Sequence, residues 1–261
     1  MRPAATGLRR RYRPFAVALL LSTAVACAGP PAEKPAPAAE PRPATPGAPY
    51  VDDAVAVADW LRSLETSTPH GPAWPDDAQE PETVTASFAT GVAGKVRFFL
   101  ALHEVTGDAA YLADAARGAD YLIGEMSVPV GVDAVPPATS FYFGLPGVCL
   151  ALDAVARATG TARYETGARS CLATVKARAQ ARDAGVEWSA RFDDLLFGNT
   201  GTALFLLEVA ERHGDATAGA LAVRAGRGLI ARGLADRGGR RLLHGDASPV
   251  HRRPGVLDRR P

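Results

Sequence analysis

Apolar positions along this chain return in blocks of about fifty residues. Three strongly apolar runs, KVRFFLAL, VCLALDAV and TALFLLEV, each follow the start of a Gly-x-x-Gly pattern and lead to a single glycine and a more charged run. The patterns start at Gly91, Gly144 and Gly198, which are 53 and 54 residues apart and so indicate an internal repeat. Apolar residues at helical spacing on both sides of a turn glycine predict a helical hairpin in each copy.

A leading helix precedes the three hairpins. The run YVDDAVAVADWL from Tyr50 matches YLADAARGADYL from Tyr111, so the chain enters the repeat on the second helix of an earlier pair. The predicted helices are residues 50–65, 91–106, 109–126, 144–159, 161–182, 198–213 and 216–233.

The repeat also predicts how the hairpins are arranged. First helices that are apolar on most sides belong inside, and the more charged second helices belong outside. Glycines at the helix starts let neighbouring N-termini pack closely and leave backbone N–H groups bare. Two concentric rings of helices make an α/α toroid, and three pairs with one leading helix predict an all-α, partial α/α toroid over residues 50–236.

This arrangement predicts a cleft at one face. The first helices carry a partial positive charge at their N-terminal ends, and the long loops 66–90, 127–143 and 183–197 lead into those ends. Aromatic and acidic side chains of these loops either line a binding cleft or plug the toroid and cap its helices. The candidate cleft residues are His70, Trp74, Phe88, Tyr142, Trp188, Asp193, Asp194 and Asn199.

Two of the loops carry candidate acid–base groups. His70 is a histidine on a loop that faces the predicted cleft. The adjacent carboxylates Asp193 and Asp194 either serve glycoside chemistry as a pair or cap the helix that follows.

Cys149 and Cys171 each lie eleven residues from the turn at Gly160, so an antiparallel hairpin places them at the same height. They either form a disulfide or are two small buried hydrophobic side chains.

The segments FYFGLPG and FGNTGTALFLLEVAERHGD, together with the repeated double-glycine helix starts, resemble the lanthionine synthetase C-like family over residues 50–236. The resemblance implies an α/α toroid, a fold that is also similar to that of six-hairpin glycosidases. Enzymes of this family close thioether rings by adding a peptide cysteine thiol to a dehydrated serine or threonine. They use a zinc ion, held by two cysteines and one histidine, that converts the thiol to a thiolate.

The zinc ligands of the family do not carry over to this chain. The resemblance places Tyr142 at the first cysteine position and Leu196 with Phe197 at the Cys-His pair. A register that starts a fourth unit at His244–Gly245 puts Leu243 in place of a cysteine. We therefore expect no zinc and no other cofactor.

The N-terminus has the pattern of a targeting segment. Residues 1–26 contain a basic stretch and an apolar core too short to span a membrane, and Ala26 directly precedes Cys27. The segment is either a lipoprotein signal that places a lipid anchor on Cys27 or a signal peptide of a secreted protein. A Pro/Ala-rich linker fills 27–49 and cannot pack.

Charge is divided unevenly along the chain. Residues 27–236 contain 17 basic and 26 acidic residues, a net charge of −9, which argues against nucleic acid as a partner. Residues 237–261 carry seven arginines, two prolines before the terminal one and no helical period. We expect this tail to result from a truncation or frame shift rather than to be an evolved element.

Three classes of function remain from the sequence. The first is an exported lanthionine synthetase C-like protein that binds or modifies a peptide without zinc. The second is a carbohydrate-active toroid, and the third is a non-catalytic scaffold at the cell surface.

Overall fold

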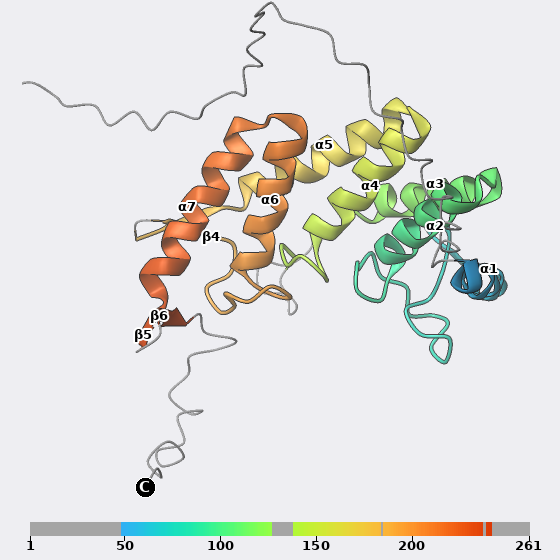
Figure 1. Cartoon of the computed structure of the whole chain (residues 1–261), viewed down its shortest axis with the longest axis horizontal. Coiled ribbons are helices and arrows are strands. Elements are labelled where there is room, and N and C mark those ends of the chain that lie inside the picture. The colour runs from blue at the N-terminus through green and yellow to red at the C-terminus, as the bar shows by residue number, and fades with distance from the viewer. Residues whose placement is uncertain (1–47, 127–137, 184, 237–238, 242–261) are drawn as a thin grey trace, which may run out of the picture. The chain divides into compact units, whose positions relative to one another are not determined.

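The computed structural model describes residues 48–126, 138–183, 185–236 and 239–241 (Figure 1). The predicted signal peptide with Cys27, most of the linker, most of the loop 127–143 and most of the tail lie outside the described residues. Within them the chain forms seven helices and three two-stranded sheets, so the all-α prediction is confirmed. The helices are α1 (Ala48–Ser63), α2 (Val92–Thr106), α3 (Ala109–Glu125), α4 (Leu145–Thr159), α5 (Ala162–Ala177), α6 (Asn199–His213) and α7 (Ala216–Arg232).

The helices pair as the repeat predicts. Helix α2 packs on α3, α4 on α5 and α6 on α7, and α4 also packs on both helices of the hairpin before it. Each hairpin turns at a glycine, Gly107, Gly160 or Gly214, with a φ of 65–73° that residues with a side chain rarely adopt. No helix in the described part of the chain is both long and apolar enough to span a membrane.

The Gly-x-x-Gly starts are explained by a backbone contact within each repeat. The first N–H of α2 donates to the carbonyl of Thr85 (2.9 Å), that of α4 to Ala138 (2.8 Å) and that of α6 to Phe192 (3.0 Å). In each case the acceptor lies seven residues before the donor. The expectation that the glycines leave these first N–H groups bare was therefore wrong, because the loop folds back over the helix start.

Both glycines of each pattern make room for that loop. A Cβ on Gly91 or Gly144 would lie 2.3 Å from the carbonyl oxygen six residues earlier, and one on Gly201 would lie 2.2 Å from it. In the second and third patterns the second glycine also receives an aromatic side chain from the preceding repeat: a Cβ on Gly147 would lie 2.5 Å from the Cβ of Phe88 and one on Gly201 2.7 Å from the Cβ of Phe141. The close packing predicted from the glycines is thus with loops, where a methyl group has no space.

Short strand pairs follow three of the helices, and the sequence patterns did not predict them. They are β1 (Thr66–Thr68) with β2 (Gly71–Ala73), β3 (Gln180–Arg182) with β4 (Gly185–Glu187), and β5 (Leu234–Asp236) with β6 (Gly239–Arg241). The helix predicted over 161–182 consequently ends at Ala177. Strand β2 packs against α3 and strand β4 against α7. The first two strand pairs therefore each connect one second helix to the next second helix.

Cys149 and Cys171 form a disulfide between α4 and α5, with Cα atoms 5.4 Å apart. Both side chains are buried, with relative exposures of 3 % and 1 %.

We expect Gly201→Ala to lower the free energy of unfolding by about 1–3 kcal/mol, since its methyl group overlaps the Leu195 carbonyl. Gly226→Ala in α7 is the matched control, because no atom lies within 4 Å of its added Cβ. Alanine there should raise stability by up to about 1 kcal/mol through helix propensity. Urea denaturation of both variants measures the difference, and an equal stability of the two would contradict the loop-contact explanation.

Candidate functional site

The three long loops meet at the N-terminal ends of the first helices. The backbone N–H groups of Phe88 and Ala89 donate to the carbonyl of Tyr142 (2.8 and 2.9 Å), and the N–H of Tyr142 donates to that of Leu196 (3.5 Å). These bonds join the first loop to the second and the second to the third. The predicted convergence of the helix starts is therefore present in the described residues.

A pocket of about 580 Å³ opens beside the start of α4. Its walls come from the loop that precedes α2, the end of α3, the first turn of α4 and one face of α5. This volume lies in the range of sites that hold small ligands or side chains. The lining residues are Asp76, Thr85, Ala86, Ser87, Thr90, Glu125, Met126, Ala138, Phe143, Gly144, Leu145, Val148, Ser170, Cys171, Thr174 and Arg178.

The loop wall of the pocket is held in place by one carboxylate. Asp76 accepts hydrogen bonds from the hydroxyl groups of Thr85 (2.6 Å) and Thr90 (2.9 Å) and from the backbone N–H of Thr85 (2.9 Å). The amine of Lys95 donates to the carbonyl of Thr90. Burial lowers the pKa of Lys95, against the opposing effect of the Asp76 charge.

Glu125 brings a second carboxylate to the pocket at the end of α3. Its Oε2 lies 3.8 Å from Nε2 of His70, and the His70 ring meets the ring of Tyr121 edge-on. The hydroxyl of Tyr121 donates to the carbonyl of Val84 (3.2 Å). Burial, together with the charges of Glu125 and Asp76, raises the pKa of Tyr121, so this phenol stays protonated. His70 thus lies behind Glu125 and supports the pocket wall.

The predicted cleft residues do not gather around this pocket. Trp74 and Asn199 have no exposed surface, so their prediction as cleft-lining residues was wrong. Phe88 and Tyr142 pack with Phe141 in an aromatic cluster with ring centroids 5.1–6.0 Å apart. The indole N–H of Trp188 donates to the carbonyl of Val175 (2.8 Å).

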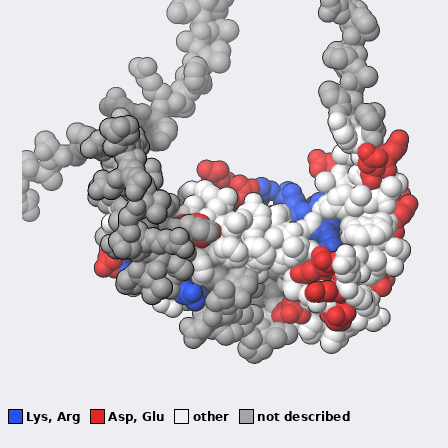
Figure 2. Space-filling view, turned by 90° about the horizontal axis from the view of Figure 1, so that it is seen from below, with Lys and Arg blue, Asp and Glu red and all other residues white. Residues whose placement is uncertain are grey.

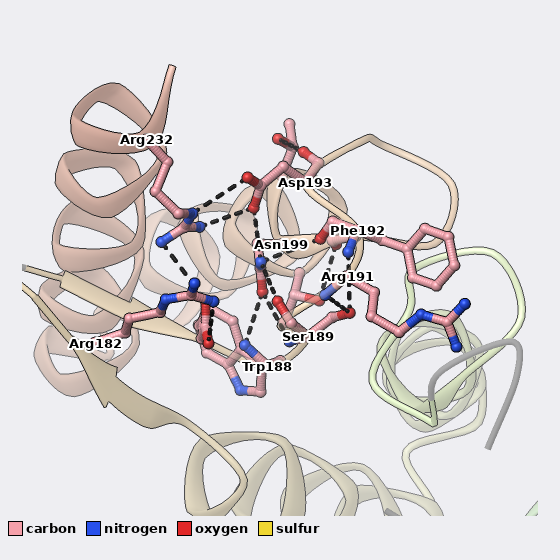
Figure 3. A network of polar contacts seen from close by, with 12 residues as sticks. Arg182, Trp188, Ser189, Arg191, Phe192, Asp193, Asn199 and Arg232 are labelled. Carbon is pink, nitrogen blue, oxygen red and sulfur yellow. Dashed lines mark hydrogen bonds and ion pairs between the residues drawn. The ribbon is translucent and has the colours of Figure 1, made fainter. Parts of the chain in front are cut away.

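Asn199 instead organises the loop before α6 (Figure 3). Its Oδ1 accepts from the backbone N–H groups of Trp188 (2.7 Å) and Ser189 (3.0 Å). Its Nδ2 donates to the carbonyls of Ser189 (2.7 Å) and Phe192 (3.1 Å) and to Oδ1 of Asp193 (2.8 Å). A buried amide that is satisfied on both sides fixes the loop rather than binding a ligand.

The carboxylates beside Asn199 are also structural. Arg232 reaches from α7 to Asp193, with Nη2 2.8 Å from Oδ1 and Nε 3.2 Å from Oδ2 (Figure 3). Burial disfavours ionisation of Asp193, but hydrogen bonds from Arg232 and Asn199 outweigh it and hold the pKa below its usual value. Oδ1 of Asp194 accepts from the backbone N–H groups of Leu196 (2.7 Å) and Phe197 (2.9 Å). The pair therefore anchors the loop. Neither carboxylate caps α6, whose N-cap residue is Gly198 and whose first N–H donates to the carbonyl of Phe192, so the capping role expected for the pair was wrong.

The positions that correspond to the zinc ligands lie near one another but carry the wrong chemistry. Tyr142 contacts Leu196 through the backbone, and the ring of Phe197 stacks on that of Phe143 with centroids 5.0 Å apart. Zinc in proteins is bound by thiolate, imidazole or carboxylate groups, and these side chains offer none. The described residues also contain no group of three or more His, Cys, Asp or Glu side chains that could hold a metal ion. The residues present at these positions do not fit zinc.

Helical hairpins that start at Gly-x-x-Gly and share one face of converging loops define the class of protein. The profile of the family described as Lanthionine synthetase C-like protein matches residues 82–222, more than half of the chain. The chain therefore belongs to the lanthionine synthetase C-like family, whose fold is the α/α toroid. A comparison with curated proteins gave no match.

The sequence did not reveal the residues of the pocket walls, because no motif marks them. Glu125 and Arg178 stand at or near the ends of the second helices, and only the fold places them beside the loop of Asp76.

The Asp193–Arg232 pair predicts a pH-dependent contribution to stability. Because the pKa of Asp193 is lower in the folded than in the unfolded protein, its contribution is present above about pH 4 and is lost as the pH falls through the folded pKa. Asp193→Asn should therefore lower the melting temperature at pH 7. The difference in melting temperature between the variant and the wild type should be smaller at pH 3. Asp77→Asn, in an exposed loop, is the control; a gap for Asp193→Asn that does not change with pH would contradict the prediction.

Proposed function

We propose that this lanthionine synthetase C-like protein is exported and binds a peptide, without zinc, in the pocket beside the start of α4. The observation that carries the proposal is that apolar and polar side chains line one pocket together. Leu145, Val148 and Cys171 are apolar lining residues, and hydroxyl, carboxylate and guanidinium groups line the same pocket. Peptides present the same mixture of apolar side chains, amides and charges.

Charge favours a cationic peptide. Asp76 and Glu125 place two carboxylates at the pocket, against the single guanidinium of Arg178. On the face in Figure 2, acidic patches are more extensive than basic ones in the described residues. The net charge of −9 over residues 27–236 attracts a cationic ligand at low ionic strength.

The side chains at the positions of the family's zinc ligands favour peptide binding over thioether ring closure. Activation of a thiol needs a metal or a nearby base, and Tyr142, Leu196 and Phe197 supply neither. A carbohydrate-active role is disfavoured because Asp193 is engaged by Arg232 and Asp194 anchors its own loop.

Export is supported by the sequence alone. The basic start, the short apolar core and Ala26–Cys27 favour a lipid anchor on Cys27, followed by a linker that holds the helical domain away from the membrane. Secretion after simple cleavage is the alternative.

Peptide binding can be tested with the full-length protein on peptide and glycan arrays, followed by titration of a peptide that binds. We expect cationic peptides to bind, and Glu125→Gln to weaken them several-fold because it removes one carboxylate charge from the pocket. Glu104→Gln, on the exposed side of α2, changes the net charge equally and should leave binding unchanged. Binding of glycans alone would favour the carbohydrate class, and binding of neither would favour the scaffold.

Lipidation predicts incorporation of radiolabelled palmitate when the full-length chain is expressed in bacteria. Cys27→Ala should lose the label, because the acyl group is attached through that residue. Equal labelling of the variant, or no labelling of the wild type, would leave a secreted protein.

A further inference from the structure

Two tryptophans occupy the same place in two different repeats. Trp74 directly follows β2 and Trp188 directly follows β4, and each strand pair begins three residues after the end of a second helix. Strand β2 packs on α3 and β4 on α7, which is the next second helix in each case. The two indoles therefore belong to one position of the repeat, although loops of different length separate them from the helix that follows.

The surroundings of Trp74 define the slot that such an indole fills. Trp74 is fully buried, and its ring packs on Phe99 with centroids 4.9 Å apart. A Cβ added to Gly118 of α3 would lie 3.0 Å from this indole and 2.5–3.3 Å from the side chains of Val96 and Val92. The slot thus lies between the first turns of α2 and the small residue on α3.

The third hairpin repeats this arrangement. Trp188 packs against the cluster of Val186, Ala203 and Ala225. Ala203 lies five residues after Gly198, as Val96 lies five after Gly91. Ala225 lies eleven residues after the turn at Gly214, as Gly118 lies eleven after Gly107. The same two small positions therefore receive an indole in both repeats.

In the middle hairpin two of these positions line the pocket beside α4. Leu145 corresponds to Val92, Cys149 to Val96 and Cys171 to Gly118. Leu145 and Cys171 line the pocket, and Cys149 is bonded to Cys171. Residues 127–137, which follow α3 in this repeat, read SVPVGVDAVPP and contain no aromatic residue. The third tryptophan of the chain, Trp60, belongs to α1.

We propose that the pocket is the indole slot of a repeat that has no tryptophan of its own, and that it binds an aromatic side chain, tryptophan above all, of the ligand. This inference rests on the proposed peptide binding and names the residue that the peptide must carry. Phe143 contributes an aromatic side chain to the pocket lining, and the carboxylates of Asp76 and Glu125 are acceptors that an indole N–H can use.

The rest of the peptide has a path away from the slot. A groove of about 620 Å³ between α3 and α5 shares Met126 and Ser170 with the pocket and continues past Ile123 and Gly167. A chain anchored by its aromatic side chain in the pocket can therefore lie along this groove.

The test compares peptide pairs that differ only in having tryptophan or leucine at one position, titrated against the full-length protein. We expect the tryptophan peptide to bind at least tenfold more tightly, because an aromatic side chain that anchors in a pocket contributes a large part of the binding energy of such an interface. Thr174→Trp places an indole at the pocket mouth and should abolish this preference. Ala173→Trp is the matched control, because Ala173 is the exposed residue just before Thr174 in α5 and does not line the pocket. This variant should keep the preference for tryptophan.

A direct measurement does not depend on either variant. The ¹⁹F NMR signal of N-acetyl-5-fluorotryptophanamide should broaden with wild-type protein and be restored by the tryptophan peptide. Equal affinity of the tryptophan and leucine peptides would overturn the aromatic slot and leave peptide binding intact. Binding of the amide in the slot without any peptide binding would support the slot and overturn the proposed function. No binding of either would overturn both.

Discussion

The fold depends on one backbone hydrogen bond that recurs in every repeat. A loop carbonyl accepts the first N–H of the helix that begins seven residues later, and glycines leave the space for it. This bond satisfies an amide that would otherwise have no partner inside the helix. It also fixes each loop against its own helix, so that the carbonyl of Tyr142 can receive the N–H groups of the preceding loop. The shared face, and the pocket beside α4, follow from that constraint.

The helices could be predicted from sequence because two strong signals coincide in them. Apolar spacing marks each helix body, and glycines mark each start and turn, so six of the seven helices begin and end within two residues of the structure. The exception, which ends at Ala177 rather than 182, runs into a strand of three residues. A strand that short has no detectable alternation, and its partner across the turn at Asp183, where φ is 49°, is visible only in the fold.

The candidate site was less predictable, because its side chains are defined by distant partners. From the sequence Trp74 is an aromatic residue in a loop, but Gly118 of α3 leaves the space in which its indole is buried. Asp193 reads as a free carboxylate, but Arg232, 39 residues away, engages it. The repeat comparison contained a usable signal. Small residues at the Cys149 and Cys171 positions recur in all three hairpins, whereas only the first and third hairpins are preceded by a tryptophan in the equivalent position of the sequence.

The disulfide and the pocket both occur in the middle hairpin, the one that has no equivalent of Trp74 and Trp188. Removing a buried tryptophan from a core costs about 3–5 kcal/mol, because contacts are lost and a cavity remains. A disulfide that closes a loop of 22 residues contributes roughly 3 kcal/mol by restricting the unfolded chain. The Cys149–Cys171 bond therefore offsets much of the stability that an indole supplies in the neighbouring repeats. It joins the two helices at the position where the indole elsewhere packs, so the middle hairpin can keep an open slot and remain folded.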